Sequence, residues 1–143
     1  MKTYETEIRI NAPKEQVWAT LMDHSNYANW NPLVVAISGD TQTGKQLNVK
    51  LQLENANPMD FQPVVLVNKH ATEFRWLGKL FVKGVFDGEH YFKLEAVNEQ
   101  ETRFIHGEIF RGIFVRPMLA LIGEKTLNGF KAMNEALKAE VER

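Results

Sequence analysis

The sequence predicts an α+β fold in which a curved antiparallel sheet of about seven strands wraps round a long C-terminal helix. Three observations predict it. From residue 34 to residue 110, short segments alternate apolar and polar side chains, as strands of an antiparallel sheet do. Residues 115–141 repeat apolar side chains with a helical period instead. Two short helices are expected between the first strand and the second.

These two short helices are indicated by capping and helix-breaking residues. Asn11 or Ala12 is expected to cap the first helix, with Pro13 in the first turn, where its missing N–H costs little. The second helix is expected over residues 25–28. It should end before Pro32, because a proline disfavours helical geometry at the residue that precedes it.

Glycine, asparagine and proline separate the expected strands. Asn98 is expected at the turn between the last two strands, and residues 78–84 are expected to form a loop or a frayed strand end. The expected strands cover residues 3–10, 34–37, 46–53, 64–67, 73–78, 86–94 and 102–110.

The C-terminal helix is unusually long. About 26 residues span roughly 40 Å at 1.5 Å per residue. Only packing against an extended surface would stabilise such an amphipathic helix. Gly123 and Gly129 lie inside it and cost about 1 kcal/mol each relative to alanine. We expect close packing, or room left for a ligand, to offset that cost.

Composition narrows the class of protein. The chain has 143 residues, of which 44% are hydrophobic, so we expect one folded domain over residues 1–143. The formal net charge is −1 and the basic residues are scattered, which argues against nucleic-acid binding. There is no cysteine, no apolar N-terminal leader and no run long enough to span a bilayer. We expect a cytoplasmic protein without stable membrane insertion.

The last two predicted strands carry an unusual face. His90 shares its face with aromatic residues, and His106 and Glu108 do the same on the facing strand. Buried polar groups need hydrogen-bond partners, so such a mixture is odd for a plain core. It is typical of the wall of a pocket for a mostly apolar ligand. A turn centred on Asn98 would place His90 opposite His106, with the two neighbouring phenylalanines opposite each other.

Three interpretations of His90, His106 and Glu108 remain open. They form a structural hydrogen-bonded cluster, a polar anchor in a ligand cavity, or a site of acid–base catalysis or metal binding. No motif with metal-ligand spacing supports metal binding, so no metal is expected. Trp30 is expected either to plug the sheet against the short helices or to lie at a pocket mouth, and Trp76 is expected to face inward.

The segments together resemble the START-like (SRPBCC) superfamily, whose helix-grip fold is shared by Bet v 1-type proteins and bacterial polyketide cyclase/dehydrase-like domains. The resemblance covers nearly the whole chain and implies a cavity between the sheet and the long helix. It implies no metal and no cofactor. The matching stretches are Ile10-Asn-Ala-Pro13 with Val17-Trp18, Tyr27-Ala-Asn-Trp30-Asn31-Pro32, Gly44 before a strand, Phe74-Arg-Trp76-Leu-Gly78, residues 86–94 and residues 102–112.

Eleven residues are the expected ligand-binding set. The resemblance implies that eight of them face the cavity. The other three lie on the C-terminal helix, where core packing or a pocket floor is expected. The eleven are Trp30, Trp76, His90, Phe92, Phe104, His106, Glu108, Phe110, Met118, Phe130 and Met133.

The leading functional expectation is the binding of a small hydrophobic ligand, such as a lipid, polyketide, isoprenoid or aromatic molecule, by a monomer or homodimer. The alternative is a cyclase or dehydratase, in which His90 or His106 would abstract a proton next to a carbonyl and Glu108 would orient it. A protein-interaction domain like the Hsp90 activators of the same superfamily ranks lowest.

Overall fold

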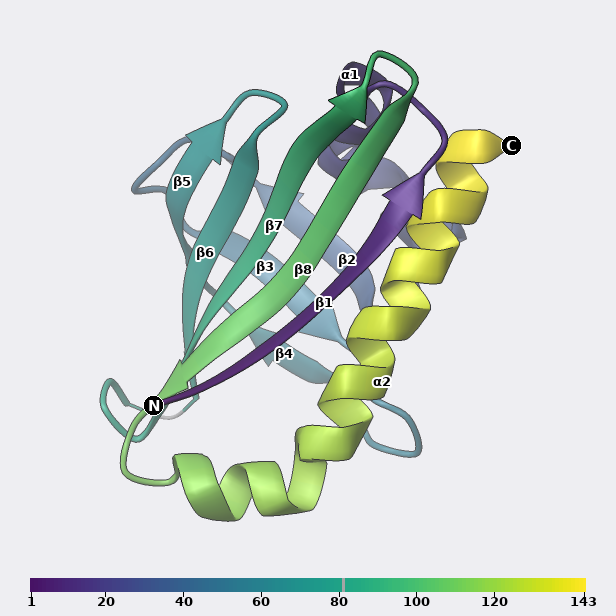
Figure 1. Cartoon of the computed structure of the whole chain (residues 1–143). Helices are drawn as coiled ribbons and strands as arrows, with labels where there is room; N and C mark the ends of the chain where they lie inside the picture. Colours follow the sequence, from purple (N-terminus) through teal and green to yellow (C-terminus); the bar gives the residue numbers. More distant parts are fainter. Residues whose placement is uncertain (81) are drawn as a thin grey trace.

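The computed structural model describes residues 1–80 and 82–143. The described chain forms eight strands, two α-helices and one 3₁₀ helix (Figure 1). In chain order these are β1 (Lys2–Ile10), α1 (Lys14–Met22), the 3₁₀ helix η1 (His24–Asn29), β2 (Val34–Gly39), β3 (Leu47–Leu51), β4 (Met59–Phe61), β5 (Val64–Lys69), β6 (Glu73–Leu80), β7 (Phe86–Asn98), β8 (Glu101–Arg111) and α2 (Val115–Glu142).

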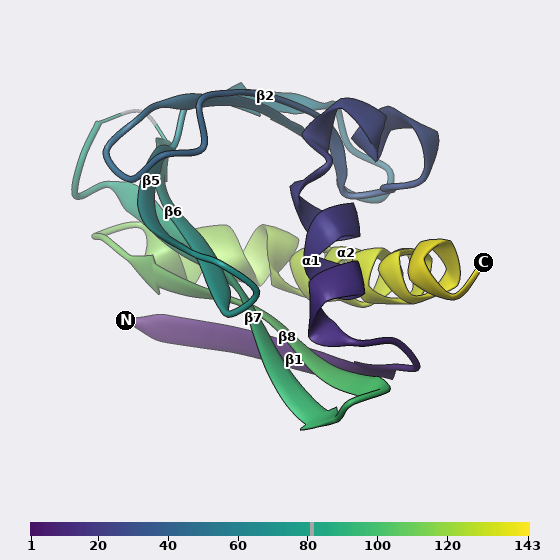
Figure 2. The same ribbon diagram turned by 90° about the horizontal axis from the view of Figure 1, so that it is seen from above.

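The strands form two antiparallel sheets. The larger sheet has the order β1-β8-β7-β6-β5 and the smaller one the order β2-β3-β4. An isolated bridge between Gln46 and Val64, with backbone hydrogen bonds from Leu47 to Pro63 and from Val65 to Lys45, connects them. Seen from above, α2 runs between the two sheets (Figure 2). The sequence therefore predicted the α+β architecture and the packing of the long helix against the sheets correctly.

The expected number of strands was too low. The structure has eight, because β4 follows the loop at residues 54–58 and is only three residues long. A segment that short shows no alternation from which a strand can be predicted. The expected strand 46–53 is shorter, and β6 continues to Leu80. The rest of the loop expected over 78–84 includes residue 81, which lies outside the described residues.

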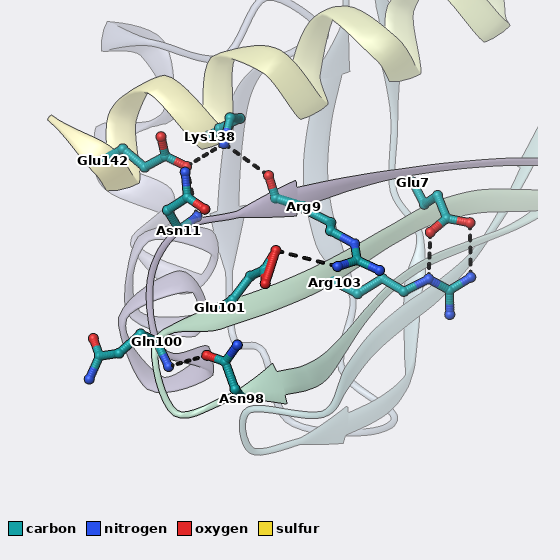
Figure 3. Close-up of polar contacts among 9 residues, drawn as sticks. All are labelled: Glu7, Arg9, Asn11, Asn98, Gln100, Glu101, Arg103, Lys138 and Glu142. Carbon is teal, nitrogen blue, oxygen red and sulfur yellow. Dashed lines mark hydrogen bonds and ion pairs between the residues drawn. The ribbon is translucent and has the colours of Figure 1, made fainter.

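The start of α1 also differs from the prediction. Pro13, with an extended backbone, is the N-cap, rather than Asn11 or Ala12. The amide of Asn11 instead donates to Oε2 of Glu142 at 2.8 Å, and Nζ of Lys138 donates to the carbonyl of Arg9 at 3.0 Å (Figure 3). The last turn of α2 is thereby attached to the corner between β1 and α1, which the sequence pattern could not show.

Close packing accounts for the glycines of α2. A Cβ on Gly123 would overlap the hydroxyl of Tyr4, and one on Gly129 would lie 2.9 Å from Cδ1 of Leu33. The helix bends after its first turns, so that this first part crosses one end of the larger sheet (Figure 1). In the described part of the chain, no helix combines the length and apolar character needed to cross a bilayer.

Candidate functional site

The register of the β7–β8 hairpin sets the geometry of the site. His90 pairs with Glu108 and Phe92 pairs with His106, so the predicted pairing of His90 with His106 was wrong by two residues. The turn is formed by residues 99 and 100 rather than centred on Asn98, and a bulge at Val97 adds one residue to β7. A shift of two residues preserves the face of a strand. All of these side chains therefore still point inward.

A chain of hydrogen bonds starts from this face. Oε1 of Glu108 lies 3.2 Å from Nδ1 of His90, and Nε2 of His90 lies 2.7 Å from Nε2 of His106. Nδ1 of His106 then lies 2.9 Å from Oδ1 of Asn134 on α2. The amide nitrogen of Asn134 donates to Oγ1 of Thr6 on β1 at 2.8 Å. Five side chains from three strands and one helix are connected in this way.

The end of the hydrogen-bonded series at Thr6 determines which atom donates and which accepts in each hydrogen bond. The hydroxyl of Thr6 donates to the carbonyl oxygen of His106 at 3.0 Å, so it accepts from the amide of Asn134. Oδ1 of Asn134 must then accept a proton from Nδ1 of His106. Burial lowers the pKa of His106 well below its usual value, and the charge of His90 lowers it further. His106 is therefore neutral, and its Nε2 carries a lone pair.

At the other end of the hydrogen-bonded series, His90 and Glu108 share one proton. Nε2 of His90 donates to the lone pair of His106, which leaves Nδ1 of His90 facing Oε1 of Glu108. Two lone pairs facing each other would be unfavourable, so one proton lies between them. It is held either by His90 as an imidazolium beside a carboxylate, or by Glu108 as a carboxylic acid beside a neutral imidazole.

Aromatic rings enclose both imidazoles. The ring of Trp76 stacks on His90 with centroids 5.0 Å apart, and Phe130 stacks on His106 at 4.4 Å. His90 and His106 are buried, whereas the side chain of Glu108 keeps 16% of its surface exposed. Glu108 is therefore the only member of the three acid–base residues with access to a ligand.

An apolar pocket of about 170 Å³ lies on the exposed side of Glu108. It is enclosed by β3, β4, the inner face of β6, β7 and β8, and the first turns of α2. Gly78 and Gly88 pair with each other across β6 and β7 and form its floor. The lining residues are Leu51, Leu53, Ala56, Met59, Asp60, Phe61, Gly78, Lys79, Phe86, Gly88, Glu108, Met118 and Ile122.

The glycine pair makes room for two side chains. A Cβ on Gly78 would lie 3.0 Å from the ring of Phe61, and one on Gly88 would overlap the carboxylate of Glu108. Because Gly88 has no side chain, the carboxylate of Glu108 can lie over β7 with one oxygen toward His90 and the other toward Gly88.

Two of the eleven predicted site residues, Glu108 and Met118, line this pocket. Trp30 is half-buried and packs against Tyr27 in the core. Phe110 belongs to a separate small cluster with Phe86 and Val115. The remaining residues are buried in the main core or in the hydrogen-bonded chain: Trp76, His90, Phe92, Phe104, His106, Phe130 and Met133.

The sequence interpretation missed Thr6, Asn134 and the residues of β4. Asn134 lies on the buried side of α2 beside Phe130 and Leu137, and a polar residue on an apolar helical stripe is a signal that it has a buried partner. Phe61 gave no signal, because its strand was not recognised. In residues 1–80 and 82–143, no group of three or more His, Cys, Asp or Glu side chains is arranged to hold a metal ion.

Comparison with known proteins identifies the family of the chain. The sequence profile of the family described as "Polyketide cyclase / dehydrase and lipid transport" matches residues 1–142. No curated protein sequence matches the chain.

Among solved structures, the Zhui aromatase/cyclase from Streptomyces sp. R1128 superposes with a TM-score of 0.80 at 13% identity, covering 99% of this chain and 94% of that one. A START superfamily protein from Mycobacterium smegmatis gives 0.73 at 16% identity, covering 98% and 97%. A norcoclaurine synthase point mutant from Thalictrum flavum gives 0.72 at 12% identity, covering 99% and 94%. At these identities the likeness shows the fold.

Proposed function

The chain belongs to the polyketide cyclase/dehydrase and lipid transport family, and on this basis we propose that it binds a small, largely apolar ligand in the pocket between the sheets and α2. One observation carries the proposal. The carboxylate of Glu108 lies at the floor of a pocket that is otherwise mainly apolar. Apolar walls with few polar groups that fix orientation are characteristic of small-molecule sites.

The size of the pocket limits which ligands fit into it. An apolar cavity of about 150 Å³ accommodates a molecule the size of benzene. The pocket of about 170 Å³ therefore matches one ring, or a short branched chain, as the buried part of the ligand. Lys79 and Asp60 are exposed at the rim, where a more polar part of the ligand would remain in water. An aromatic or isoprenoid group fits this description better than a long acyl chain.

Glu108 would orient such a ligand by hydrogen bonding. Its oxygen over Gly88 is not used by His90, so it is available to accept from a hydroxyl group inside the pocket. A ligand with one ring and one hydroxyl group, such as p-cresol, satisfies both the apolar walls and the carboxylate. Toluene has nearly the same shape but no hydroxyl group.

Thermal unfolding with these two probes tests the binding. A ligand that binds only the native protein stabilises it by RT ln(1 + [L]/Kd). We expect p-cresol to raise the Tm more than toluene, and Glu108→Gln to remove the difference. Met118→Trp should fill the pocket and abolish both shifts, whereas Leu121→Trp, on the exposed side of α2, should retain them. Equal shifts in Met118→Trp and wild type would contradict the proposed location.

The hydrogen-bonded chain favours a second candidate function, which is proton transfer of the cyclase or dehydratase type. With His90 as an imidazolium, the Glu108 carboxylate would take a proton from a carbon next to a ligand carbonyl, and the electron pair would form the enolate. The pair would then hold two protons. Returning one to a β-hydroxyl group would release water, and the enolate electrons would form the new double bond.

Hydrogen–deuterium exchange distinguishes this chemistry from binding alone. In deuterated water, the wild-type protein should accelerate exchange at the α-carbon of a single-ring β-hydroxy ketone above the buffer rate. Glu108→Gln should lose the acceleration, although the apolar lining of the pocket, including Met118, is unchanged in this variant. If exchange stays at the buffer rate although p-cresol raises the Tm, the protein binds ligand without this chemistry.

A further inference from the structure

Exposed apolar side chains are concentrated at one end of the molecule. Among the described residues, seven large hydrophobic side chains are exposed, and only Val64 and Val97 lie elsewhere. This end carries the N-terminus, residues 82–85 before β7 and the start of α2 (Figure 1). The five exposed residues there are Met1, Val82, Ile113, Phe114 and Leu121, and we refer to them as the apolar tip.

Two loops of the apolar tip hold each other in place. The amide of Ile113 donates to the carbonyl of Gly84 at 3.1 Å, and the amide of Phe114 donates to that of Val85 at 3.0 Å. Gly112 has a φ of +133°, and a Cβ there would overlap the carbonyl of Val85. The loops can approach this closely only because Gly112 has no side chain. Ile113 is consequently presented on a fixed backbone with 77% of its surface in water.

The exposed stripe of α2 changes character along the helix. Phe114 and Leu121 are seven residues apart and share one helical face, and Leu121 is 77% exposed. Further along the same side, Asn128 and Lys131 are exposed and polar. Apolar exposure is thus confined to the first two turns, the part of α2 that bends across the end of the sheet (Figure 1).

Exposed basic residues flank the apolar tip, and one exposed acidic residue, Glu124, lies about one helical turn after Leu121. Lys2, Lys83 and Arg116 are exposed, and none of them forms an ion pair with another described residue. Asp87, the first acidic residue of β7, is half-buried, and its carboxylate accepts from the amide of Gly84 at 3.0 Å. Exposed apolar side chains with a basic border match the interface of an anionic bilayer, where the apolar groups enter the headgroup region and the cations lie against phosphates.

We propose that the apolar tip docks the protein onto anionic membrane surfaces as a peripheral, reversible contact. A second copy of the chain fits this surface less well. A two-fold interface would pair the surface with itself and bring Lys83 and Arg116 of both copies together. Lipid phosphates neutralise the same charges. The docking concerns the surface alone and does not depend on the identity of the pocket ligand.

The position of the apolar tip suits ligand exchange with a membrane. Phe86 and Met118 line the pocket and follow directly after the two loops of the tip in the sequence. A docked protein would therefore hold the mouth of its pocket at the level of the lipid headgroups. This consequence rests on the proposed function, whereas the docking itself can be tested without any pocket ligand.

The lack of cysteine permits a direct test. Ile113→Cys introduces a single thiol, which is labelled with an environment-sensitive NBD fluorophore. Val97→Cys, at the opposite end of the β7–β8 hairpin, is the matched control. Each protein is titrated with vesicles of phosphatidylcholine and phosphatidylglycerol, or of phosphatidylcholine alone. Unlabelled wild type, Phe114→Ser/Leu121→Ser and Lys83→Glu/Arg116→Glu are compared by co-sedimentation with the same vesicles.

We expect a severalfold rise and a blue shift of the emission at position 113 with the anionic vesicles, and no change at position 97. Both double variants should lose most of their co-sedimentation, and added salt should weaken the binding of the wild type. Equal responses at positions 113 and 97, or co-sedimentation that both double variants retain, would overturn the proposal. So would a failure to bind vesicles combined with a dimer that Phe114→Ser/Leu121→Ser dissociates.

Discussion

Gly88 lies directly beneath the carboxylate of Glu108, so that a Cβ at position 88 would overlap one of its oxygens. The two residues are on neighbouring strands, and the absence of one side chain determines where the other lies. The other carboxylate oxygen lies 3.2 Å from Nδ1 of His90. The contact in which His90 and Glu108 share a proton therefore also requires a glycine at position 88.

Gly88→Ala should therefore displace Glu108 without unfolding the protein. The overlapping atoms form the far end of a flexible side chain, which can rotate into the pocket. We expect the Tm of the free protein to change little, and the additional stabilisation by p-cresol over toluene to disappear. Gly78→Ala is the matched control, because its Cβ would meet Phe61 and leave Glu108 in place. If p-cresol still raises the Tm of Gly88→Ala more than toluene does, Glu108 does not orient the ligand.

Asn134 anchors the hydrogen-bonded chain, and Asn134→Leu should break it. Leucine has the same branch point and the same number of side-chain heavy atoms, but it leaves Nδ1 of buried His106 without an acceptor, which costs about 1–3 kcal/mol. Asn128→Leu, at an exposed position of the same helix, should stay within about 0.5 kcal/mol of wild type in urea unfolding.

Nitrogen-15 NMR of the histidines separates this anchoring role from simple packing. In the wild-type protein we expect His106 in the tautomer with its proton on Nδ1, and in Asn134→Leu a mixture of the two tautomers. A wild-type His106 with its proton on Nε2 would contradict the direction that we derive for the chain.

Much of the fold could be predicted because period and turn residues are local properties. The alternation in β1, β7 and β8 and the helical stripe of α2 identified those elements within a few residues. The register of the β7–β8 hairpin could not be predicted in this way. It depends on the turn at residues 99 and 100 together with the bulge at Val97, and neither changes the alternation within each strand.

The site was predicted in part for the same reason. His90, His106 and Glu108 were recognised because they share a face, which is a property of single strands. Thr6 and Asn134 complete the chain from elements far away in sequence, and only the packing of α2 onto β1 brings them together. The pocket is formed where Gly78 and Gly88 pair, so its location depends on the register of two strands.

Acid should destabilise the protein through two histidines that are neutral in the fold. Burial lowers the pKa of His24 to about 4 from the usual 6.5, and it also lowers the pKa of His106 well below its usual value. Below pH 6.5 the unfolded chain binds protons that the native protein does not, so the free energy of unfolding falls as the pH falls. Each such group contributes about 1.4 kcal/mol per pH unit.

Urea unfolding between pH 7.5 and 4.5 measures this slope. His24→Phe should retain the ring contacts with Tyr27 and Phe74 and reduce the slope below pH 6.5 by up to about 1.4 kcal/mol per pH unit. Above pH 7 the variant and the wild type should run parallel. A variant with the slope of the wild type throughout would mean that His24 is protonated in the native protein.

The contact between Gly123 and Tyr4 can be tested with a double-mutant cycle. Gly123→Ala gains about 1 kcal/mol of helix propensity, but its Cβ would overlap the hydroxyl of Tyr4, and such overpacking costs about 1–3 kcal/mol. In a Tyr4→Phe background the next atom, Cζ, lies at an ordinary 3.4 Å. We therefore expect Gly123→Ala to destabilise the wild type and to stabilise Tyr4→Phe by up to about 1 kcal/mol in urea unfolding. The same loss in both backgrounds would mean that the helix bend, rather than Tyr4, requires the glycine.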